Sequence, residues 1–339
     1  MVRIVRENEP ITIGNVTVQP GERAYIEVPL ARLPTNTWMS IPIAVVNGIN
    51  PGPNLWLNAA IHGDEINGVD VIRRVLKRIK PKAMSGVLIT VPIVNIIGFL
   101  NQSRYLPDRR DLNRLFPGSA RGSLGSRMAH FFMTEVVARC DYGVDMHTGA
   151  FHRNNLPQIR ADLSDEGTRE LAFAFGTPIV INSSVRDGSL RAEATELGKR
   201  VLLYEAGEPS RFSESAIKIG VQGVMNLMRF LGMLEGSIRM TRKLPWESDG
   251  STWLRAKRGG ILRTYCDVGD IVEEGEPVGV ISDTFDEDVY TLKAPASGVV
   301  VGITKLPLVN QGDGILHVAN IKQLPSRRRI PRRTIFLEK

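Results

Sequence analysis

The sequence predicts an α/β fold in which helices cover a mixed, partly parallel sheet, with a small all-β module at the C-terminal end. Residues 55–61 and 87–94 are predominantly apolar, and the segment 66–80 between them carries apolar residues at helical spacing. This strand–helix–strand pattern is typical of parallel strands that are buried on both faces. After about residue 259 the chain changes to short apolar runs separated by glycine, which predicts the all-β module.

The other elements can be predicted in order along the chain. Short β-like runs at 11–13 and 41–46 are interpreted as edge strands that lead into the first buried strand. A long polar loop over 101–125, rich in arginine and aspartate, follows the second buried strand, and loops of this length are usually functional or disordered. The elements expected after it are a helix at about 126–139, a strand at 142–147, a helix near 165–175, strands at 179–181 and 200–205, and a helix that Ser210 caps and that ends at about 234.

The composition of the 339-residue chain is that of a soluble globular protein, with 42% hydrophobic and 23% charged residues. The formal net charge of +7 arises mostly from residues 326–339, in which six residues are basic and one is acidic. A folded nucleic-acid-binding face is therefore not expected. The tail is interpreted as solvated or as a strap across the surface, and docking to an acidic partner is the alternative.

The cysteines, the N-terminal segment and the apolar stretches indicate in which cellular compartment the protein is expected. The two cysteines, Cys140 and Cys266, lie far apart, and the N-terminal segment has no apolar region of the kind found in signal peptides. The longest apolar stretch, residues 88–100, is interrupted by proline, asparagine and glycine and is too short to span a bilayer. We therefore expect a cytoplasmic protein without a disulfide framework and without a membrane partner.

Three predicted strands end at or next to a polar residue with metal-binding or catalytic potential: His62, His147 and Glu205. In open α/β sheets, ligands bind beyond the carboxyl ends of the strands, so these side chains are expected to converge. Glu65 follows His62 after a glycine-containing turn, and an imidazole with a carboxylate suits Zn²⁺. Alone, this spacing is a weak signal, because a turn-capping histidine and a glutamate in the first turn of a helix also produce it.

Four short motifs occur in order along the chain, and they are His62-Gly63-Asp64-Glu65, Asp111-Leu112-Asn113-Arg114, Asp145-Met146-His147-Thr148-Gly149 and Tyr204-Glu205-Ala206-Gly207. Together they resemble the succinylglutamate desuccinylase/aspartoacylase family, a branch of the carboxypeptidase A-like zinc hydrolases. The resemblance covers roughly residues 40–235. It implies a zinc carboxypeptidase-like α/β sandwich, which agrees with the sheet predicted above.

The resemblance also implies roles for these residues. His62, Glu65 and His147 would hold one Zn²⁺ per chain and leave a position for a water molecule, whose pKa the ion would lower. Glu205 would take the proton of this zinc-activated water and deliver it to the departing amine. Asp111 would orient His62 through the other nitrogen of its ring.

Further roles concern substrate binding and the oxyanion. Asn113 and Arg114 match the family pair that binds a substrate carboxylate, and a guanidinium suits that planar group. Arg104 resembles the family arginine that polarises the scissile carbonyl and stabilises the oxyanion. Its spacing to Asn113 is wider than in aspartoacylase, so Arg109 and Arg110 remain alternatives for this role.

The C-terminal module at about 255–322 resembles a biotinyl/lipoyl-type barrel-sandwich hybrid. A carrier domain needs a lysine at the tip of its hairpin, but the tip at 283–288 contains none, and Lys293 lies away from it. We therefore expect a structural or oligomer-forming cap. The predicted organisation is a catalytic domain at 1–242, the β module at 243–325 and a basic tail at 326–339.

The residues and the resemblance together predict a zinc-dependent amidohydrolase that removes an acyl group from an N-acyl amino acid or a related small N-acyl amine. A metallocarboxypeptidase that acts on peptide C-termini is one alternative, because it uses the same kind of centre. A non-catalytic binding protein on the same fold is the other. The expected partner is the small-molecule substrate, with no nucleic acid, and a homo-oligomer is left open.

Overall fold

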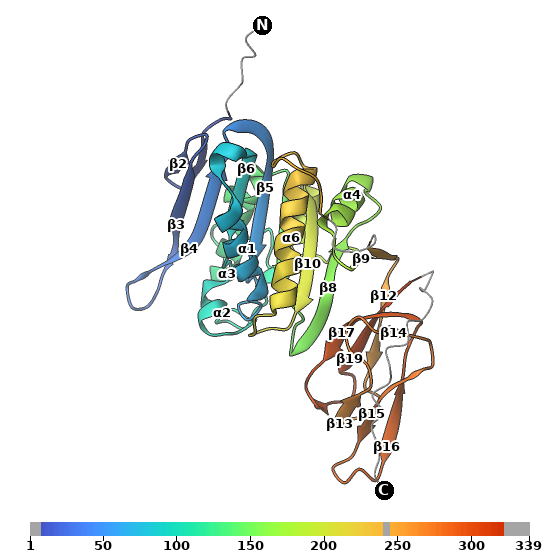
Figure 1. Cartoon of the computed structure of the whole chain (residues 1–339). Coiled ribbons are helices and arrows are strands. Elements are labelled where there is room, and N and C mark those ends of the chain that lie inside the picture. The colour runs from blue at the N-terminus through green and yellow to red at the C-terminus, as the bar shows by residue number, and fades with distance from the viewer. Residues whose placement is uncertain (1–7, 240–244, 322–339) are drawn as a thin grey trace.

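The computed structural model describes residues 8–239 and 245–321, and Figure 1 shows how their elements are arranged. The basic tail predicted at 326–339 and the domain boundary predicted between residues 242 and 243 lie outside the described residues. Within them, helices cover a large mixed sheet, and the C-terminal region is rich in antiparallel strands. This confirms the predicted fold class.

The large sheet contains thirteen strands among the described residues. From one edge to the other, its main path follows β3 (Arg23–Arg32), β4 (Trp38–Asn47), β6 (Ser85–Val91), β5 (Asn50–Ala59), β7 (Tyr142–His147), β10 (Arg200–Gly207), β8 (Arg153–Ala161), β17 (Gly298–Thr304), β19 (Gly314–Asn320) and β12 (Ser251–Arg255). The pairs β5–β6, β5–β7 and β7–β10 are parallel, whereas β4 and β8 run antiparallel to their neighbours in this path. The carboxyl ends of β5, β7 and β10 therefore meet at one edge.

The sheet divides at β8. The first residues of β8, near Asn155, pair with β17, whereas residues 158–161 pair with β9 (Ile179–Asn182). β9 pairs in turn with β11 (Trp246–Ser248), and β14 (Ile271–Val272) pairs with β17. Hydrogen bonding thus continues from the central sheet into the C-terminal strands through β8 and β17.

The remaining strands form two smaller sheets. A hairpin near the N-terminus joins β1 (Ile11–Ile13) to β2 (Val16–Val18). The C-terminal four-stranded sheet follows the order β16 (Val289–Lys293), β15 (Pro277–Ser282), β13 (Gly260–Thr264) and β18 (Leu308–Val309). The turn between β15 and β16 spans the predicted hairpin tip at 283–288, which holds no lysine.

Helices cover both faces of the central sheet. On one face lie α1 (Asn67–Arg78), α4 (Glu166–Phe175) and α6 (Glu214–Phe230), which share a core with Leu55 and Leu57 of β5. On the other face lie α3 (Leu124–Glu135) and α5 (Leu190–Glu196), which share a core with Trp56. Leu55, Trp56 and Leu57 of β5 alternate between the two cores, which explains why these three consecutive residues are all apolar. The short helical elements are α2 (Ile96–Leu100), η1 (Pro81–Ala83), η2 (Leu112–Arg114) and η3 (Val137–Arg139).

Several elements differ from those expected. The sequence does not predict β8, because Pro157 and two asparagines are residues that strands disfavour. Nor does it predict α2 or α5, which are too short to show a clear helical period. β5 begins at residue 50 instead of 55, and β6 ends at residue 91 instead of 94.

The start of the last helix is also corrected. Ser213 caps α6, since its Oγ accepts a hydrogen bond from the backbone N–H of Ala216, whereas the sequence suggests Ser210. Ser210 instead adopts a left-handed φ of 58°, and its N–H donates to the backbone oxygen of Asp64. Across the described ranges, no helix combines the length and the apolar character that a bilayer crossing requires.

The C-terminal strands meet the central sheet around three side chains. The indole of Trp253 in β12 and the imidazole of His317 in β19 are stacked, with ring centroids 4.2 Å apart. The guanidinium of Arg153 in β8 lies 5.1 Å from the Trp253 ring centroid and donates to the backbone oxygen of Gly314. Burial, together with the positive charges of Arg160 and Arg153, lowers the pKa of His317 to about 3. This imidazole is therefore neutral at physiological pH.

A buried neutral histidine predicts sensitivity to acid. The pKa of His317 falls from 6.5 in the unfolded chain to about 3 in the fold, so the unfolded chain binds more protons between these values. Stability should then decrease as the pH falls through this window, by up to about 1.4 kcal/mol per pH unit. We expect His317→Gln to flatten this decrease in the free energy of unfolding, measured by chemical denaturation at several pH values. The same substitution at the exposed His152 is the control, and equal slopes in all three proteins would contradict the prediction.

Candidate active site

The turn after β5 brings His62 and Glu65 to the carboxyl edge of the central sheet. The N–H of Glu65 donates to the backbone oxygen of His62 over 3.0 Å, which closes a tight turn before α1. Gly63 allows this turn to lie against α2, because a Cβ there would be 1.9 Å from the backbone carbon of Gly98. His147 is the last residue of β7, the strand that pairs with β5.

The side chains of His62, Glu65 and His147 converge on one buried point. Each offers a ligand atom, and these atoms all lie within 4.8 Å of one another. Nδ1 of His62 is 2.8 Å from Oε1 of Glu65, and Nδ1 of His147 is 2.8 Å from Oε2 of the same carboxylate. The two Nδ1 atoms are 3.1 Å apart. All three side chains are buried.

An aspartate holds each histidine ring from behind. Nε2 of His62 lies 3.2 Å from Oδ1 of Asp111, and Nε2 of His147 lies 2.9 Å from Oδ2 of Asp145. When each Nε2 donates its proton to the aspartate, the tautomer of the ring is fixed. Both Nδ1 atoms then present a lone pair to the space they share with Glu65.

The charges of this cluster favour a cation at its centre. Burial alone would lower the pKa of His147, but the carboxylates of Asp145 and Glu65 outweigh it and hold this pKa well above its ordinary value. Burial alone would raise the pKa of Glu65, but His62 and His147 hold it well below its ordinary value. A metal ion could replace the protons that these groups otherwise attract. Two imidazoles and a carboxylate form a donor set found in catalytic zinc sites, so the residues fit this ion.

A chain of buried hydrogen bonds extends from His147 into the sheet. Asp145 contacts His147 through one carboxylate oxygen and accepts from Nδ2 of Asn58 through the other, over 2.6 Å. Oδ1 of Asn58 accepts in turn from the indole N–H of Trp56, over 3.0 Å. Gly143 leaves room for this indole, because a Cβ there would lie 2.0 Å from the ring. The orientation of His147 therefore depends on side chains of two neighbouring strands.

Glu205 lies on β10, beside the strand that carries His147. The two residues are partners in the parallel register of β10 and β7, so their side chains lie on the same face of the sheet. Oε2 of Glu205 accepts a hydrogen bond from Nδ2 of Asn155 on β8, over 2.6 Å. Gln158, also on β8, is the register partner of Glu205 on its other side. A row of three polar side chains thus crosses β7, β10 and β8.

Gln158 in this row and Arg191 near it have unused hydrogen-bonding capacity in the part of the chain that the structure describes. Both polar atoms of the Gln158 amide are buried without a partner, and so is Nη1 of Arg191 on α5. Burial and the positive charge of Arg160 lower the pKa of Arg191 to about 10, and the carboxylates of Glu205 and Asp145 oppose this shift. Within the described residues, these donors and acceptors thus remain unpaired close to Glu205.

Among the three arginines considered for the oxyanion, Arg104 is the one that contacts Glu65 and Asp111. Its Nη1 donates to Oε1 of Glu65 over 3.2 Å, and its Nη2 donates to Oδ2 of Asp111 over 2.8 Å. Arg109 and Arg110 are exposed, and Arg110 forms an ion pair at the surface. The loop therefore places one guanidinium at the edge of the candidate metal centre.

Asn113 and Arg114 lie in η2, directly after Asp111. Oδ1 of Asn113 accepts a hydrogen bond from the backbone N–H of Leu190, over 2.9 Å, and so holds the start of α5. The side chain of Arg114 is exposed and donates to the backbone oxygen of Asn113. The oxygen of the Asn113 side chain is thus used within the fold, whereas the guanidinium of Arg114 is accessible to a ligand.

Sequence reasoning did not identify the supporting residues Asn58, Asn155, Gln158 and Arg191. Asn58 had a signal, because it is a polar residue inside an otherwise apolar strand. Asn155 and Gln158 had none, because β8 is not predicted as a strand and its pairing with β10 cannot be read from the sequence.

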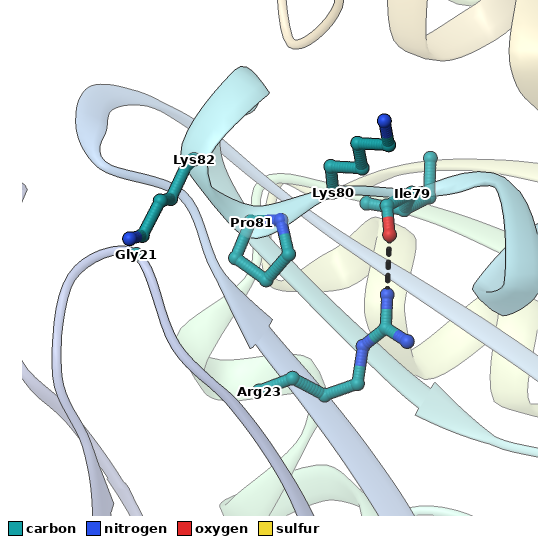
Figure 2. Close-up of a pocket in the computed structure, with 6 residues that line it drawn as sticks. All are labelled: Gly21, Arg23, Ile79, Lys80, Pro81 and Lys82. Carbon is teal, nitrogen blue, oxygen red and sulfur yellow. Dashed lines mark hydrogen bonds between the residues drawn. The ribbon is translucent and has the colours of Figure 1, made fainter.

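Neither of two pockets among the described residues is lined by His62, Glu65, His147 or Glu205. A pocket of about 460 Å³ is lined by Asn154, Glu208, Arg211, Phe212, Ser213 and Lys305, and Asn154 is the neighbour of Asn155 in β8. Figure 2 shows the other pocket, of about 400 Å³, lined by Gly21, Arg23 and residues 79–82. It lies at the C-terminal end of α1, where Arg23 donates to the backbone oxygen of Ile79. Because α1 begins two residues after Glu65, this second pocket lies at the end of the helix away from the candidate site.

The hydrogen-bond chain behind His147 predicts an effect on metal affinity. Asn58→Ala removes the donor to Asp145, and we expect it to weaken zinc binding by about 10- to 100-fold. The measurement is competition with a chromophoric chelator. Asn47→Ala is the matched control, because Asn47 is equally buried and hydrogen-bonded but lies at the opposite end of the sheet. Equal zinc affinities of the two variants would show that the hydrogen bonds behind His147 do not support metal binding.

Comparisons with known proteins agree with this geometry. The catalytic-domain model of the succinylglutamate desuccinylase/aspartoacylase family matches residues 51–231. The chain is 26% identical over 318 residues to N-alpha-acetyl-L-2,4-diaminobutyric acid deacetylase from Halomonas elongata, over 88% of this chain and 92% of that protein. The crystal structure of a succinylglutamate desuccinylase/aspartoacylase from Rhodobacter sphaeroides is similar, with a TM-score of 0.81, 28% identity, and coverage of 89% of this chain and 95% of that one.

A further structure shares the fold. The product-bound ectoine utilization protein EutE (DoeB) from Ruegeria pomeroyi has a TM-score of 0.80 and 23% identity, over 88% of this chain and 94% of that one. These likenesses extend beyond the segment that the family model matches, so they include C-terminal strands. The matched segment itself spans more than half of the chain and contains His62, Glu65, His147 and Glu205. The chain therefore belongs to the succinylglutamate desuccinylase/aspartoacylase family.

Proposed function

We propose that this protein is a zinc-dependent amidohydrolase that removes an acyl group from an N-acyl amino acid or a related small N-acyl amine. The main support is the position of Glu205 on the strand next to His147, beside three buried groups that converge as catalytic zinc ligands do. Membership of a family named for a desuccinylase and an acylase adds to this support. The Halomonas elongata relative is named as a deacetylase, which agrees with cleavage of an amide bond.

We assign the metal ligands to Nδ1 of His62, Nδ1 of His147 and the carboxylate of Glu65, with one ion per chain. When bound, zinc would act as a Lewis acid that lowers the pKa of a water molecule toward neutrality. The backbone N–H of Thr148 donates to Oε2 of Glu65 over 3.1 Å, so this carboxylate is held in place from the His147 side. Asp111 is assigned to orient His62.

The residues around the metal ligands are assigned the remaining steps. Glu205 would accept the proton of the attacking water and deliver it to the nitrogen of the departing amine. Asn155 donates a hydrogen bond to Oε2 of Glu205, so Oε1 would remain for proton transfer. Arg104 places a positive charge at the edge of the site, where it would stabilise the negative charge that develops on the carbonyl oxygen.

The substrate is assigned to the space between these residues and the surface. Arg114 offers an exposed guanidinium that would bind the carboxylate of an N-acyl amino acid. The unpartnered amide of Gln158 would contact a polar group of the substrate beside Glu205, since a buried amide without a partner is costly. A small substrate, as opposed to a peptide, agrees with the burial of the metal ligands.

The proposal is tested with a panel of N-acetyl and N-succinyl amino acids beside short peptides. Free amine released by zinc-loaded protein is measured, and the metal content is determined on the same batch. We expect release from N-acyl amino acids and none from peptides. Cleavage of peptides alone would identify a metallocarboxypeptidase, and a zinc-replete protein inactive on every substrate would favour a binding protein on the same fold.

Replacement of the proposed base separates metal binding from turnover. Glu205→Gln should keep stoichiometric zinc and lower kcat by about 10²- to 10⁴-fold, because the amide cannot accept the proton. Metal content and steady-state rates of the same preparation provide the measurement. Glu214→Gln, an exposed glutamate at the start of α6, is the control. If Glu205→Gln retains most of the wild-type rate, Glu205 is not the base.

Replacement of Arg114 tests carboxylate recognition. Arg114→Ala should raise KM for an N-acyl amino acid by about tenfold or more, because a charge-assisted contact is lost. KM for the same substrate with its carboxylate blocked as an amide should change little. Arg121→Ala, which removes an exposed arginine from the same loop, is the control. Equal losses on free and blocked substrates would remove the proposed role.

A further inference from the structure

Asn155 links the proposed base to the C-terminal strands. Its side chain is 8% exposed, and its Nδ2 donates to Oε2 of Glu205 over 2.6 Å. The register between β8 and β10 shifts between Glu205 and Gly207. A bulge therefore lies where the side chains of Asn155 and Glu205 meet. Bulges of this kind often redirect a side chain beside an active site. The direction of the Glu205 carboxylate thus depends on a residue of the neighbouring strand.

Gly302 of β17 lies directly behind Asn155. The two residues are partners in the antiparallel register of β8 and β17, the pairing that joins the C-terminal strands to the central sheet. A Cβ at position 302 would lie 2.8 Å from Oδ1 of Asn155, which is closer than real Cβ contacts, so an alanine here would displace the amide from its present position. Oδ1 therefore faces Gly302, and Nδ2 faces Glu205.

Contacts within the C-terminal strands hold Gly302 in turn. His317 of β19 is its register partner and is buried. The His317 ring is stacked on Trp253 with an interplanar angle of 8°, and its Nε2 lies 2.7 Å from Oγ of Ser251. These contacts fix β19, and β19 fixes the backbone of β17 against which Asn155 rests.

We propose that Asn155 is a positioning residue for Glu205 and that the C-terminal β module holds Asn155 in place through Gly302. This inference rests on the role of Glu205 proposed above. One hydrogen bond from the amide fixes one carboxylate oxygen and thereby the direction of the other. The module then supports the carboxylate of Glu205. This role does not require the lysine that a carrier domain needs.

Substitutions of Asn155 test the first half of the proposal. Asn155→Ala should lower kcat by about 10- to 100-fold, with KM and zinc content within about twofold of the wild type. Asn155→Ser keeps a donor on a smaller side chain and should recover part of the rate. Asn155→Asp keeps the shape but brings a carboxylate against Glu205, so its kcat should be at least as low as that of Asn155→Ala. Wild-type kcat in both Asn155→Ala and Asn155→Asp would overturn the proposal.

A double-mutant cycle tests the second half. Gly302→Ala should lower kcat several-fold in the wild-type background and much less in the Asn155→Ala background, because the Oδ1 atom that the new Cβ would meet is then absent. Gly250→Ala is the matched control, since a Cβ at 250 meets nothing within 4 Å. Equal losses from Gly302→Ala in both backgrounds would show that Gly302 acts on the fold in general, and this would overturn the role of the module.

Amine release by the wild type on the same substrate panel distinguishes failure of the amidohydrolase proposal from failure of the positioning role of Asn155. A wild type that releases amine, together with Asn155 variants of unchanged kcat, would contradict the positioning role and leave the amidohydrolase proposal standing. A zinc-replete wild type that releases no amine from any substrate would contradict both. Thermal unfolding of each variant shows whether a lost rate is due to lost fold.

Discussion

Two imidazole rings whose Nδ1 atoms point at one another, 3.1 Å apart, determine the rest of this site. When both Nδ1 atoms carry lone pairs, this arrangement is unfavourable unless a proton or a metal ion lies between the rings. Glu65 bridges the two rings from the front, and Asp111 and Asp145 hold them from behind. A buried charge that loses its partner is costly, so these five side chains form one unit in which each depends on the others.

The sheet supports the proposed metal ligand His147 and the proposed base Glu205 by separate routes. His147 is held through Asp145 and Asn58, inside the parallel strands β7 and β5. Glu205 is held through Asn155, on the antiparallel strand β8 that leads to the C-terminal strands. Metal affinity and turnover should therefore respond to different substitutions, although the two groups lie on adjacent strands.

The centre of the site could be predicted from sequence because the apolar runs at 55–61, 142–147 and 200–205 each end at or next to a polar residue, namely His62, His147 and Glu205. Its surroundings could not. β8 contains Pro157 and polar residues that strands disfavour, so the support of Glu205 by Asn155 was not predictable. The contacts of Arg104, and not of Arg109 or Arg110, with Glu65 and Asp111 depend on the path of a long loop, which spacing does not determine. The boundary between catalytic domain and β module stays a prediction, and β8 pairs with β17 across it.

The most direct measurement is amine release during a zinc titration of metal-free protein, with the best N-acyl amino acid from the panel as substrate. If His62, Glu65 and His147 form a catalytic zinc site, activity should be absent at the start, rise linearly with added zinc and saturate at about one ion per chain. The His147→Ala variant should show no such rise. Activity that is full in the metal-free protein, or that rises equally in His147→Ala, would contradict a metal-dependent mechanism at this site.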